Sequence, residues 1–226
     1  WYLLKDKHVE FARRSFRIAA AFGLAGTLSV IVLGDESGYA VSESQKSKLA
    51  AIEAMWETEP APAGFNLVAS INEEQQANDW AIRVPYMLGL IATRSTSEVL
   101  PGIREIREKN KERIASGVLA VAALEDLRKN PADTAAQEKF KQHEADMGYG
   151  LLVRRHVEDV RQATPEVIEK AAMDSVPKVA PLFWSFRVMV GLGFLMLGLF
   201  VAAIWLSIHN THRKHPLLMK AFLWSL

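Results

Sequence analysis

The 226-residue chain contains no cysteine. Disulfide bonds, CxxC redox chemistry and thiolate metal sites are therefore excluded. The formal net charge is only +1 and no RNA- or DNA-reading motif is present, so nothing indicates a nucleic-acid partner. Mean hydropathy is +0.03, too low for a chain lying wholly in a membrane. The chain begins at Trp1 without an initiator Met and ends inside an apolar run, so we interpret it as a segment of a longer polypeptide.

Apolar residues are instead concentrated in two runs, one near each end. Phe16–Leu33 supplies about 18 mostly apolar residues, near the minimum for crossing a bilayer, although a buried helix of a soluble core is an alternative. Pro181–Ile208 is long enough to cross with tilt, and Trp184 and Trp205 lie near its ends as interfacial aromatics do. Pro216–Leu226 has the composition of the first turns of another membrane helix.

Basic clusters flank both runs and predict the topology. Arg13, Arg14 and Arg17 precede the first run, and Arg213 and Lys214 follow the second. By the positive-inside rule both clusters are cytoplasmic. We therefore expect the end of a membrane helix (1–7), a cytoplasmic turn and transmembrane helix (8–33), an extracytoplasmic loop (34–180), a transmembrane helix (181–208), and a cytoplasmic turn with the start of the next membrane helix (209–226).

The long loop shows helical patterns of its own. We expect a short helix at Lys46–Glu57, a long one from Leu100 to Asn130, and a third capped by Asp133 or Thr134 that runs to about Met147. Thr164 followed by Pro165 marks a further helix start. The apolar stretch 80–93 is too short to cross and is interrupted by proline, so an interfacial or re-entrant segment is expected. The predicted fold class is an all-α membrane protein whose transmembrane helices flank a long, largely helical extracytoplasmic loop.

Charged residues gather in the stretch from Gly34 to Phe65, which we expect to begin where the first apolar helix stops. Asp35 and Glu36 lie at that predicted membrane boundary, where acids are costly unless they face protein or a ligand. Lys48 and Glu53 are five residues apart, which turns about 140° on an ideal helix. They can flank a ligand lying across the helix, but without further information a solvated helix face is the better explanation of the pair.

The second apolar run contains Arg187 and Met189 about two turns from its outer end. An arginine there must be paired or reach the interface, and a haem propionate is one suitable partner. Met189 can be an axial haem ligand, which would give a raised potential with a histidine opposite, or ordinary packing. His209, His212 and His215 read as an interfacial basic cluster rather than a metal site, because no carboxylate accompanies them.

Several stretches resemble subunit I of the cytochrome bd quinol oxidases. They are SVIVLGDESGY (29–39), KLAAIEAMWETEPAPAGF (48–65), IATRS (91–95), GYGLL (148–152) and DSVPKVAPLFWSFRVM (174–189). The resemblance covers essentially the whole chain. It implies that the loop is the long form of the family's quinol-binding Q-loop, lying on the periplasmic side of a bacterial inner membrane.

The resemblance also implies roles for single residues. Lys48 and Glu53 match the pair tied to quinol oxidation, with Asp35 and Glu36 as support. Met189 matches an axial ligand of haem b558, and Arg187 matches a residue that supports this haem. The histidine opposite Met189 and the ligands of haem b595 and haem d are expected outside this segment.

The expected function is quinol oxidation at the Q-loop with electron transfer to haem b558, as part of an oxidase that reduces O2 to water. Expected partners are ubiquinol or menaquinol, subunit II, small accessory subunits and membrane lipid. The alternative is a two-span membrane sensor with a helical extracytoplasmic domain. A sensor has no need of Arg187 inside a span, and it usually continues into a signalling helix rather than another apolar run.

Overall fold

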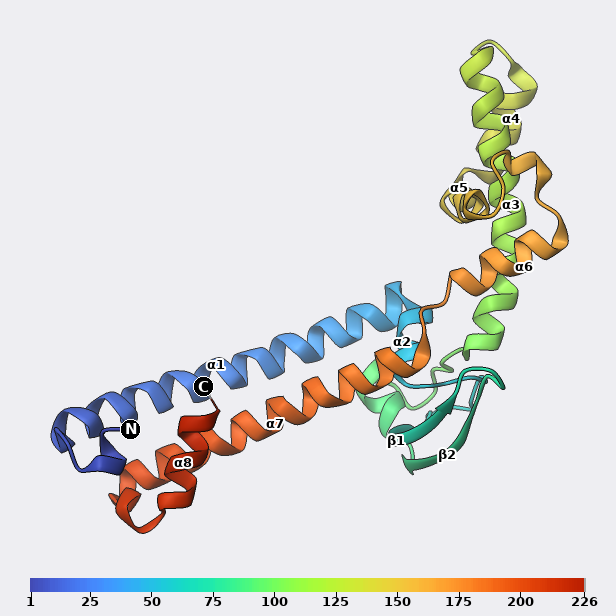
Figure 1. The fold of residues 1–226 in the computed structure, drawn as a ribbon. Helices are drawn as coiled ribbons and strands as arrows, with labels where there is room; N and C mark the ends of the chain where they lie inside the picture. The colour runs from blue at the N-terminus through green and yellow to red at the C-terminus, as the bar shows by residue number, and fades with distance from the viewer. Residues whose placement is uncertain (226) are drawn as a thin grey trace. The chain divides into compact units, whose positions relative to one another are not determined.

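The computed structural model describes residues 1–225, which form two units (Figure 1). The first unit contains the segments Trp1–Gly38 and Ser185–Leu226, apart from the last residue, and the second contains Tyr39–Trp184. Two long helices, α1 (Val9–Ser44) and α7 (Val179–His209), carry most of the first unit.

Both α1 and α7 are long and apolar enough to cross a membrane, as the two apolar runs predict. Only 6% of the most apolar window of each helix is buried within the structure, so these surfaces are available to lipid or to other protein. At Gly23 of α1 the ring of Phe200 from α7 occupies the space that a Cβ would fill. A small residue here therefore permits close packing of the two helices.

The expected end of the first helix at Gly34 is wrong. The helix α1 continues through Asp35 and Glu36 to Ser44. One glycine costs a helix only about 1 kcal/mol, which a 36-residue helix tolerates. Ser37 and Ser44 also satisfy their hydroxyls inside the helix by donating to the carbonyls of Leu33 and Ala40.

Short elements lie where α1 begins and α7 ends. A 3-10 turn, η1 (Leu3–Lys5), replaces the expected end of an α-helix, whereas the predicted helix after Pro216 is confirmed as α8 (Pro216–Trp224). A second 3-10 turn, η6 (His212–Lys214), joins α7 to α8. Leu3, Leu206 and Met219 form the small apolar core that holds these elements together.

The second unit begins with α2 (Lys46–Ile52) and then contains an antiparallel hairpin, β1 (Phe65–Asn72) and β2 (Ala77–Val84), paired with Phe65 opposite Val84. The expectation of an interfacial or re-entrant segment at residues 80–93 is wrong, because residues 80–84 belong to strand β2 of the hairpin. Only the end of that stretch is helical, as the π-helical turn η2 (Gly89–Thr93).

The remaining elements confirm the helical predictions for this part of the chain. They are α3 (Ile103–Lys129), α4 (Thr134–His143), η3 (Glu144–Asp146), α5 (Met147–Gly150), η4 (Leu151–Arg155), η5 (Val160–Gln162) and α6 (Pro165–Asp174). Asp133 caps α4 by accepting from the amide of Ala136, and Thr164 caps α6 by accepting from Val167. The α-helical class is therefore confirmed, with the hairpin as an unpredicted addition.

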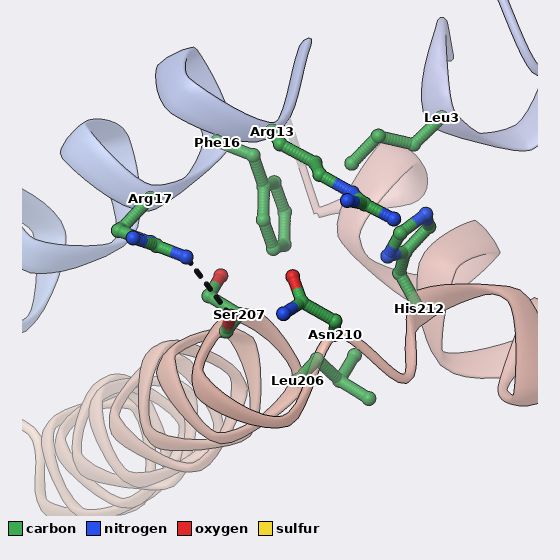
Figure 2. Close-up of a pocket in the computed structure, with 8 residues that line it drawn as sticks. All are labelled: Leu3, Arg13, Phe16, Arg17, Leu206, Ser207, Asn210 and His212. Carbon is green, nitrogen blue, oxygen red and sulfur yellow. Dashed lines mark hydrogen bonds between the residues drawn. The ribbon is translucent and has the colours of Figure 1, made fainter. Parts of the chain in front are cut away.

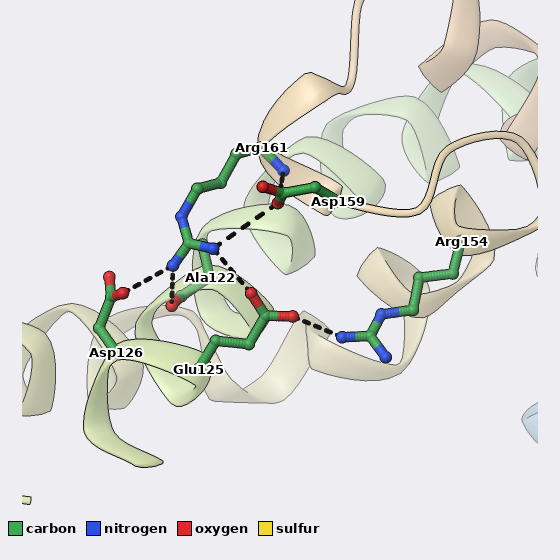
Figure 3. Close-up of polar contacts among 6 residues, drawn as sticks. All are labelled: Ala122, Glu125, Asp126, Arg154, Asp159 and Arg161. Atoms are coloured by element: carbon green, nitrogen blue, oxygen red, sulfur yellow. Dashed lines mark hydrogen bonds and ion pairs between the residues drawn. The ribbon is translucent and has the colours of Figure 1, made fainter. Parts of the chain in front are cut away.

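The later elements pack along α3. Gly117 of α3 and Gly150 of α5 lie in backbone contact, so a side chain at either position would overlap the other helix. Polar contacts hold η5 to the C-terminal half of α3: Arg161 pairs with Glu125 and Asp126 at 2.7 Å each and donates to the carbonyl of Ala122 (Figure 3). These contacts make α3 the axis of this part of the unit.

Candidate functional site

The turn that follows α2 places Glu53. Ala54 has φ of 50°, the left-handed conformation, and its amide donates to the carbonyl of Ala51. The amide of Met55 reaches back to the carbonyl of Ala50, at 2.9 Å. This pair of bonds is the Schellman arrangement that closes a helix, with an alanine where glycine is usual. The helix therefore ends five residues before the predicted Glu57, and Glu53 lies at its C-cap.

Two asparagines from the hairpin hold this turn. The side-chain amide of Asn66 in β1 donates to the backbone carbonyl of Glu53 at 2.9 Å. Asn78 in β2 donates to the carbonyl of Ala54 and accepts from the indole of Trp56, both at 3.0 Å. Carbonyls that the end of a helix leaves unpaired are thus satisfied by side chains. Neither asparagine was predicted from the sequence, where the available signal was a polar residue within an otherwise apolar, strand-like run.

The N-terminus of α3 also docks on this turn. The amides of Ile103 and Arg104 donate to the carbonyls of Met55 and Trp56, at 2.9 and 3.1 Å. Thr58 accepts from the amide of Gly102 at 2.9 Å, and a Cβ at Gly102 would overlap the backbone of Glu57. The first amides of α3, which have no partner inside the helix, therefore find one in the turn.

Glu53 itself is buried, with 3% of its surface exposed. The apolar residues beside it in the sequence belong to the largest core cluster of the unit, which includes Leu49, Ala54, Met55 and Phe183. A carboxyl group in such surroundings is costly unless it is compensated, and buried acids of this kind are frequent proton donors and acceptors. The burial of Glu53 is unlike the solvated helix face that was the alternative interpretation.

Lys48 differs from Glu53 in its surroundings. It lies on α2, where its side chain is exposed, as is that of Lys46. The structure thus places one member of the predicted pair in the core and the other at the surface of the same short helix. An exposed ammonium group can meet a ligand that approaches from solvent or from the membrane.

A groove of about 450 Å³ begins directly after Glu53 and is lined by Ala54, Trp56 and Asn78, among other residues. Two ion pairs lie on its walls, Arg83 with Glu59 and Arg104 with Glu57. Because each arginine there is matched by a carboxylate, the groove has no marked preference for a charged ligand. Glu53 itself does not line this groove.

Asp35 and Glu36 lie on α1, in the first unit, and both are exposed. They belong to the same helix as Tyr39, which begins the second unit and stacks against the guanidinium of Arg94, 4.7 Å from the ring centre. Their position on a continuous helix, rather than after its end, is the main difference from the sequence-based expectation.

Arg187 and Met189 both lie on α7. Two residues turn an ideal helix by about 200°, so the two side chains leave it in nearly opposite directions. Met189 is 59% exposed, whereas Arg187 is half-buried with its guanidinium 5.7 Å from the ring centre of Phe186. Gly193 lies one turn from Met189 on the same face, and a Cβ there would meet nothing within 4 Å.

The three histidines after α7 are not equivalent. His212 is buried, whereas His209 and His215 are exposed and lie beside the ring of Trp205. Within residues 1–225 no group of three or more His, Asp or Glu side chains is arranged to hold a metal ion.

Comparison with known proteins gives one family. The family model for cytochrome bd terminal oxidase subunit I matches residues 1–226. The chain is 35% identical over 226 residues to cytochrome bd-II ubiquinol oxidase subunit 1 of Escherichia coli, covering all of this chain and 44% of that protein. It is 26% identical over 205 residues to cytochrome bd ubiquinol oxidase subunit 1 of Bacillus subtilis, covering 91% and 32%.

Among solved structures, bd oxidase from Geobacillus thermodenitrificans aligns with a TM-score of 0.41 at 19% identity, covering 94% of this chain and 52% of that one. The chain thus spans less than half the length of the curated relatives it matches. Since the family model covers every residue, the chain belongs to the cytochrome bd terminal oxidase subunit I family.

Proposed function

We propose that this chain is the quinol-oxidising segment of a quinol:oxygen oxidoreductase, with residues 34–180 as the Q-loop. The observation that carries the proposal is the burial of Glu53 at a turn held by three separate elements. Relatives in the family are named ubiquinol oxidases. Family membership also favours this function over the two-span sensor.

Glu53 is the proton acceptor in this proposal. Oxidation of a quinol releases two protons and two electrons, and a positioned carboxylate can take a proton from the hydroxyl that it contacts. The Asn66 and Asn78 hydrogen bonds fix the backbone that directly follows the Glu53 side chain, at the carbonyls of Glu53 and Ala54. A fixed base needs no rearrangement when the substrate arrives.

Lys48 orients the substrate from the surface side. Its ammonium group donates hydrogen bonds but cannot accept them, so it suits the second quinol oxygen. It also favours negative charge on that oxygen as the proton leaves. Asp35 and Glu36, both on α1, have a supporting role in this proposal that rests on the family resemblance alone.

Met189 and Arg187 hold haem b558 in this proposal. The exposed thioether of Met189 and the open space at Gly193, on the same face of α7, fit the flat face of a porphyrin. Arg187 leaves the helix on another side, so only the length of its side chain allows it to reach a propionate at the rim. When bound, the haem accepts electrons one at a time; haem b595 and haem d are held outside this segment.

The loop is periplasmic in this proposal, because both basic clusters lie at the other ends of α1 and α7. Protons from quinol are then released outside the bacterial inner membrane. Ubiquinol or menaquinol, subunit II, small accessory subunits and surrounding lipid complete the enzyme, which reduces O2 to water with electrons from two quinols.

The test is Glu53→Gln in the complete oxidase. Glutamine keeps the shape and hydrogen bonding but cannot take a proton, so quinol oxidase activity should fall by a factor of about 10² to 10⁴. Haem content should not change. Glu74→Gln, at an exposed position in the hairpin turn, is the matched control.

A fall in quinol oxidase activity could come from lost quinol chemistry or from a damaged structure. Oxygen reduction driven by an artificial donor that bypasses the quinol site separates these two explanations. Survival of that activity places Glu53 in quinol chemistry. An equal fall in bypass and quinol activity would make Glu53 a structural residue, and the proposal would fail.

A further inference from the structure

The first unit is strongly basic at the end where α1 begins and α7 ends. Residues 1–17 and 209–220 contain eight Lys and Arg side chains against two carboxylates, Asp6 and Glu10. These segments meet where α1 begins and α7 ends, through the core of Leu3, Leu206 and Met219. Positive charge is therefore concentrated on a few adjoining turns rather than spread over the unit.

Several of these polar side chains converge on a small cavity (Figure 2). Arg13 and Arg17 enter it from α1, and Asn210 and His212 enter it from the segment after α7. Figure 2 shows Arg13 and His212 pointing toward one another, with Asn210 between Ser207 and His212. The enclosed volume is about 10 Å³, enough for roughly one water molecule.

Two nitrogens at this cavity are buried without a hydrogen-bond partner in the described part of the chain, namely Nε of Arg13 and Nε2 of His212. His212 is only 6% exposed. Buried donors are normally paired, and each exception needs an explanation. Arg17 is partly used, since it donates to the carbonyl of Ser207 at 3.2 Å, but a guanidinium has five N–H donors.

The nearby acids do not neutralise this group of cations. Glu10 is 3.7 Å from Arg13 and its side chain is 79% exposed, while Asp6 is paired with Arg213 at 2.9 Å. Burial lowers the pKa of His212, and the charges of Arg13 and Arg213 lower it further, against a smaller opposing effect of Asp6. An anion beside Arg13 and His212 would oppose both effects, because a nearby negative charge favours the protonated form of the imidazole.

We propose that Arg13, Arg17 and His212 bind a phosphate group, carried by an anionic phospholipid or free in solution. Guanidinium groups match the oxygens of a phosphate in pairs, and basic pockets between membrane helices are suited to lipid head groups. The cavity is too small for a whole phosphate, so the group lies at its entrance. One or two of its oxygens point inward to Arg13 and His212.

The experiment uses the complete oxidase, purified in detergent and stripped of lipid. Its melting temperature is followed during titration with phosphatidylglycerol, and separately with sodium phosphate against sodium chloride at equal ionic strength. A ligand that binds only the folded state raises the Tm as its concentration passes the Kd. Stabilisation by phosphatidylglycerol alone identifies a lipid head group, and stabilisation by phosphate as well identifies the free anion as a ligand.

Arg13→Gln and Arg14→Gln form the matched pair. Both remove one positive charge from the same turn of α1, but Arg14 is exposed and does not line the cavity. The concentration needed for half of the stabilisation should rise about tenfold in Arg13→Gln, the loss of one hydrogen bond to a charged group, and should not change in Arg14→Gln. Equal shifts in the two variants would overturn the proposal, because they would show a diffuse basic surface rather than a site.

His212→Leu is the second variant and decides the matter if Arg13→Gln fails to assemble with haem. A bound phosphate favours the charged imidazole, so binding of phosphatidylglycerol should strengthen as the pH falls from about 8 to about 5.5. The leucine variant should lose this dependence. Binding that is unchanged in strength and in pH dependence would show that the cavity holds only water.

Discussion

The indole nitrogen of Trp56 donates a hydrogen bond to the side-chain oxygen of Asn78, 3.0 Å away. The nitrogen of the same amide donates to the carbonyl of Ala54. One asparagine in β2 therefore fixes two points of the turn that follows Glu53. The hairpin, which follows the charged stretch from Gly34 to Phe65, is part of what positions the candidate base.

Asn78→Ala tests this coupling. It leaves the indole N–H of Trp56 and the carbonyl of Ala54 without their partner in a buried region, which should destabilise the turn by about 1–3 kcal/mol. Hydrogen exchange measured by mass spectrometry should show faster exchange in peptides covering residues 53–58. Asn72→Ala, at the exposed end of the same hairpin, should leave these peptides unchanged.

Lys48→Ala tests the role of the exposed lysine. The proposed orienting contact acts on the bound quinol, so the apparent KM for quinol should rise by more than kcat falls. Steady-state kinetics with a soluble quinol analogue measure both. Lys46→Ala removes the same charge from the start of the same helix and should have little effect; similar changes in both variants would indicate a general charge effect.

Met189→Leu tests the haem ligand. The substitution keeps volume and apolarity, so it should cost less than about 1.5 kcal/mol in folding. It removes the thioether, and the spectrum and potential of the low-spin haem should change selectively. Met196→Leu, two turns further along α7, serves as the control. An unchanged haem spectrum in Met189→Leu would refute the assignment.

Limited proteolysis tests the topology. Lys109–Arg113 lies inside α3, whereas residues 128–130 are exposed at its C-terminal end. Because a protease needs locally unfolded backbone, trypsin added to intact spheroplasts should cut first after Arg128 or Lys129. Cleavage that occurs only in inverted membrane vesicles would reverse the proposed orientation.

Much of the helical structure could be predicted because its signals are local. Thr164 with Pro165 marks a helix start, and so does Asp133 before Thr134; both caps form as expected. The i, i+4 pair of Glu105 and Lys109 forms on α3 with 2.8 Å between the charged atoms. The apolar lengths of α1 and α7 were likewise sufficient to predict both long helices.

Other features depend on contacts distant in the sequence. An alanine in the left-handed conformation ends α2, and nothing local distinguishes Ala54 from the helical alanines before it. The turn is stabilised by Asn66, Asn78 and the amides of α3, which no local pattern reveals. The hairpin was missed because its turn, residues 73–76, lacks the glycine that usually marks one. The burial of Glu53 follows from these same contacts.

The joint between α3 and the turn after Glu53 uses main-chain atoms on both sides, from Met55 and Trp56 to Ile103 and Arg104. Every amino acid except proline offers the same amide, so the hydrogen bonds themselves do not require particular side chains at 103 and 104. Only Gly102 is tied to one residue type, because any side chain there would overlap Glu57. The bonds that attach α3 to the turn of the proposed quinol site are therefore set by the course of the two backbones rather than by particular side chains at 103 and 104.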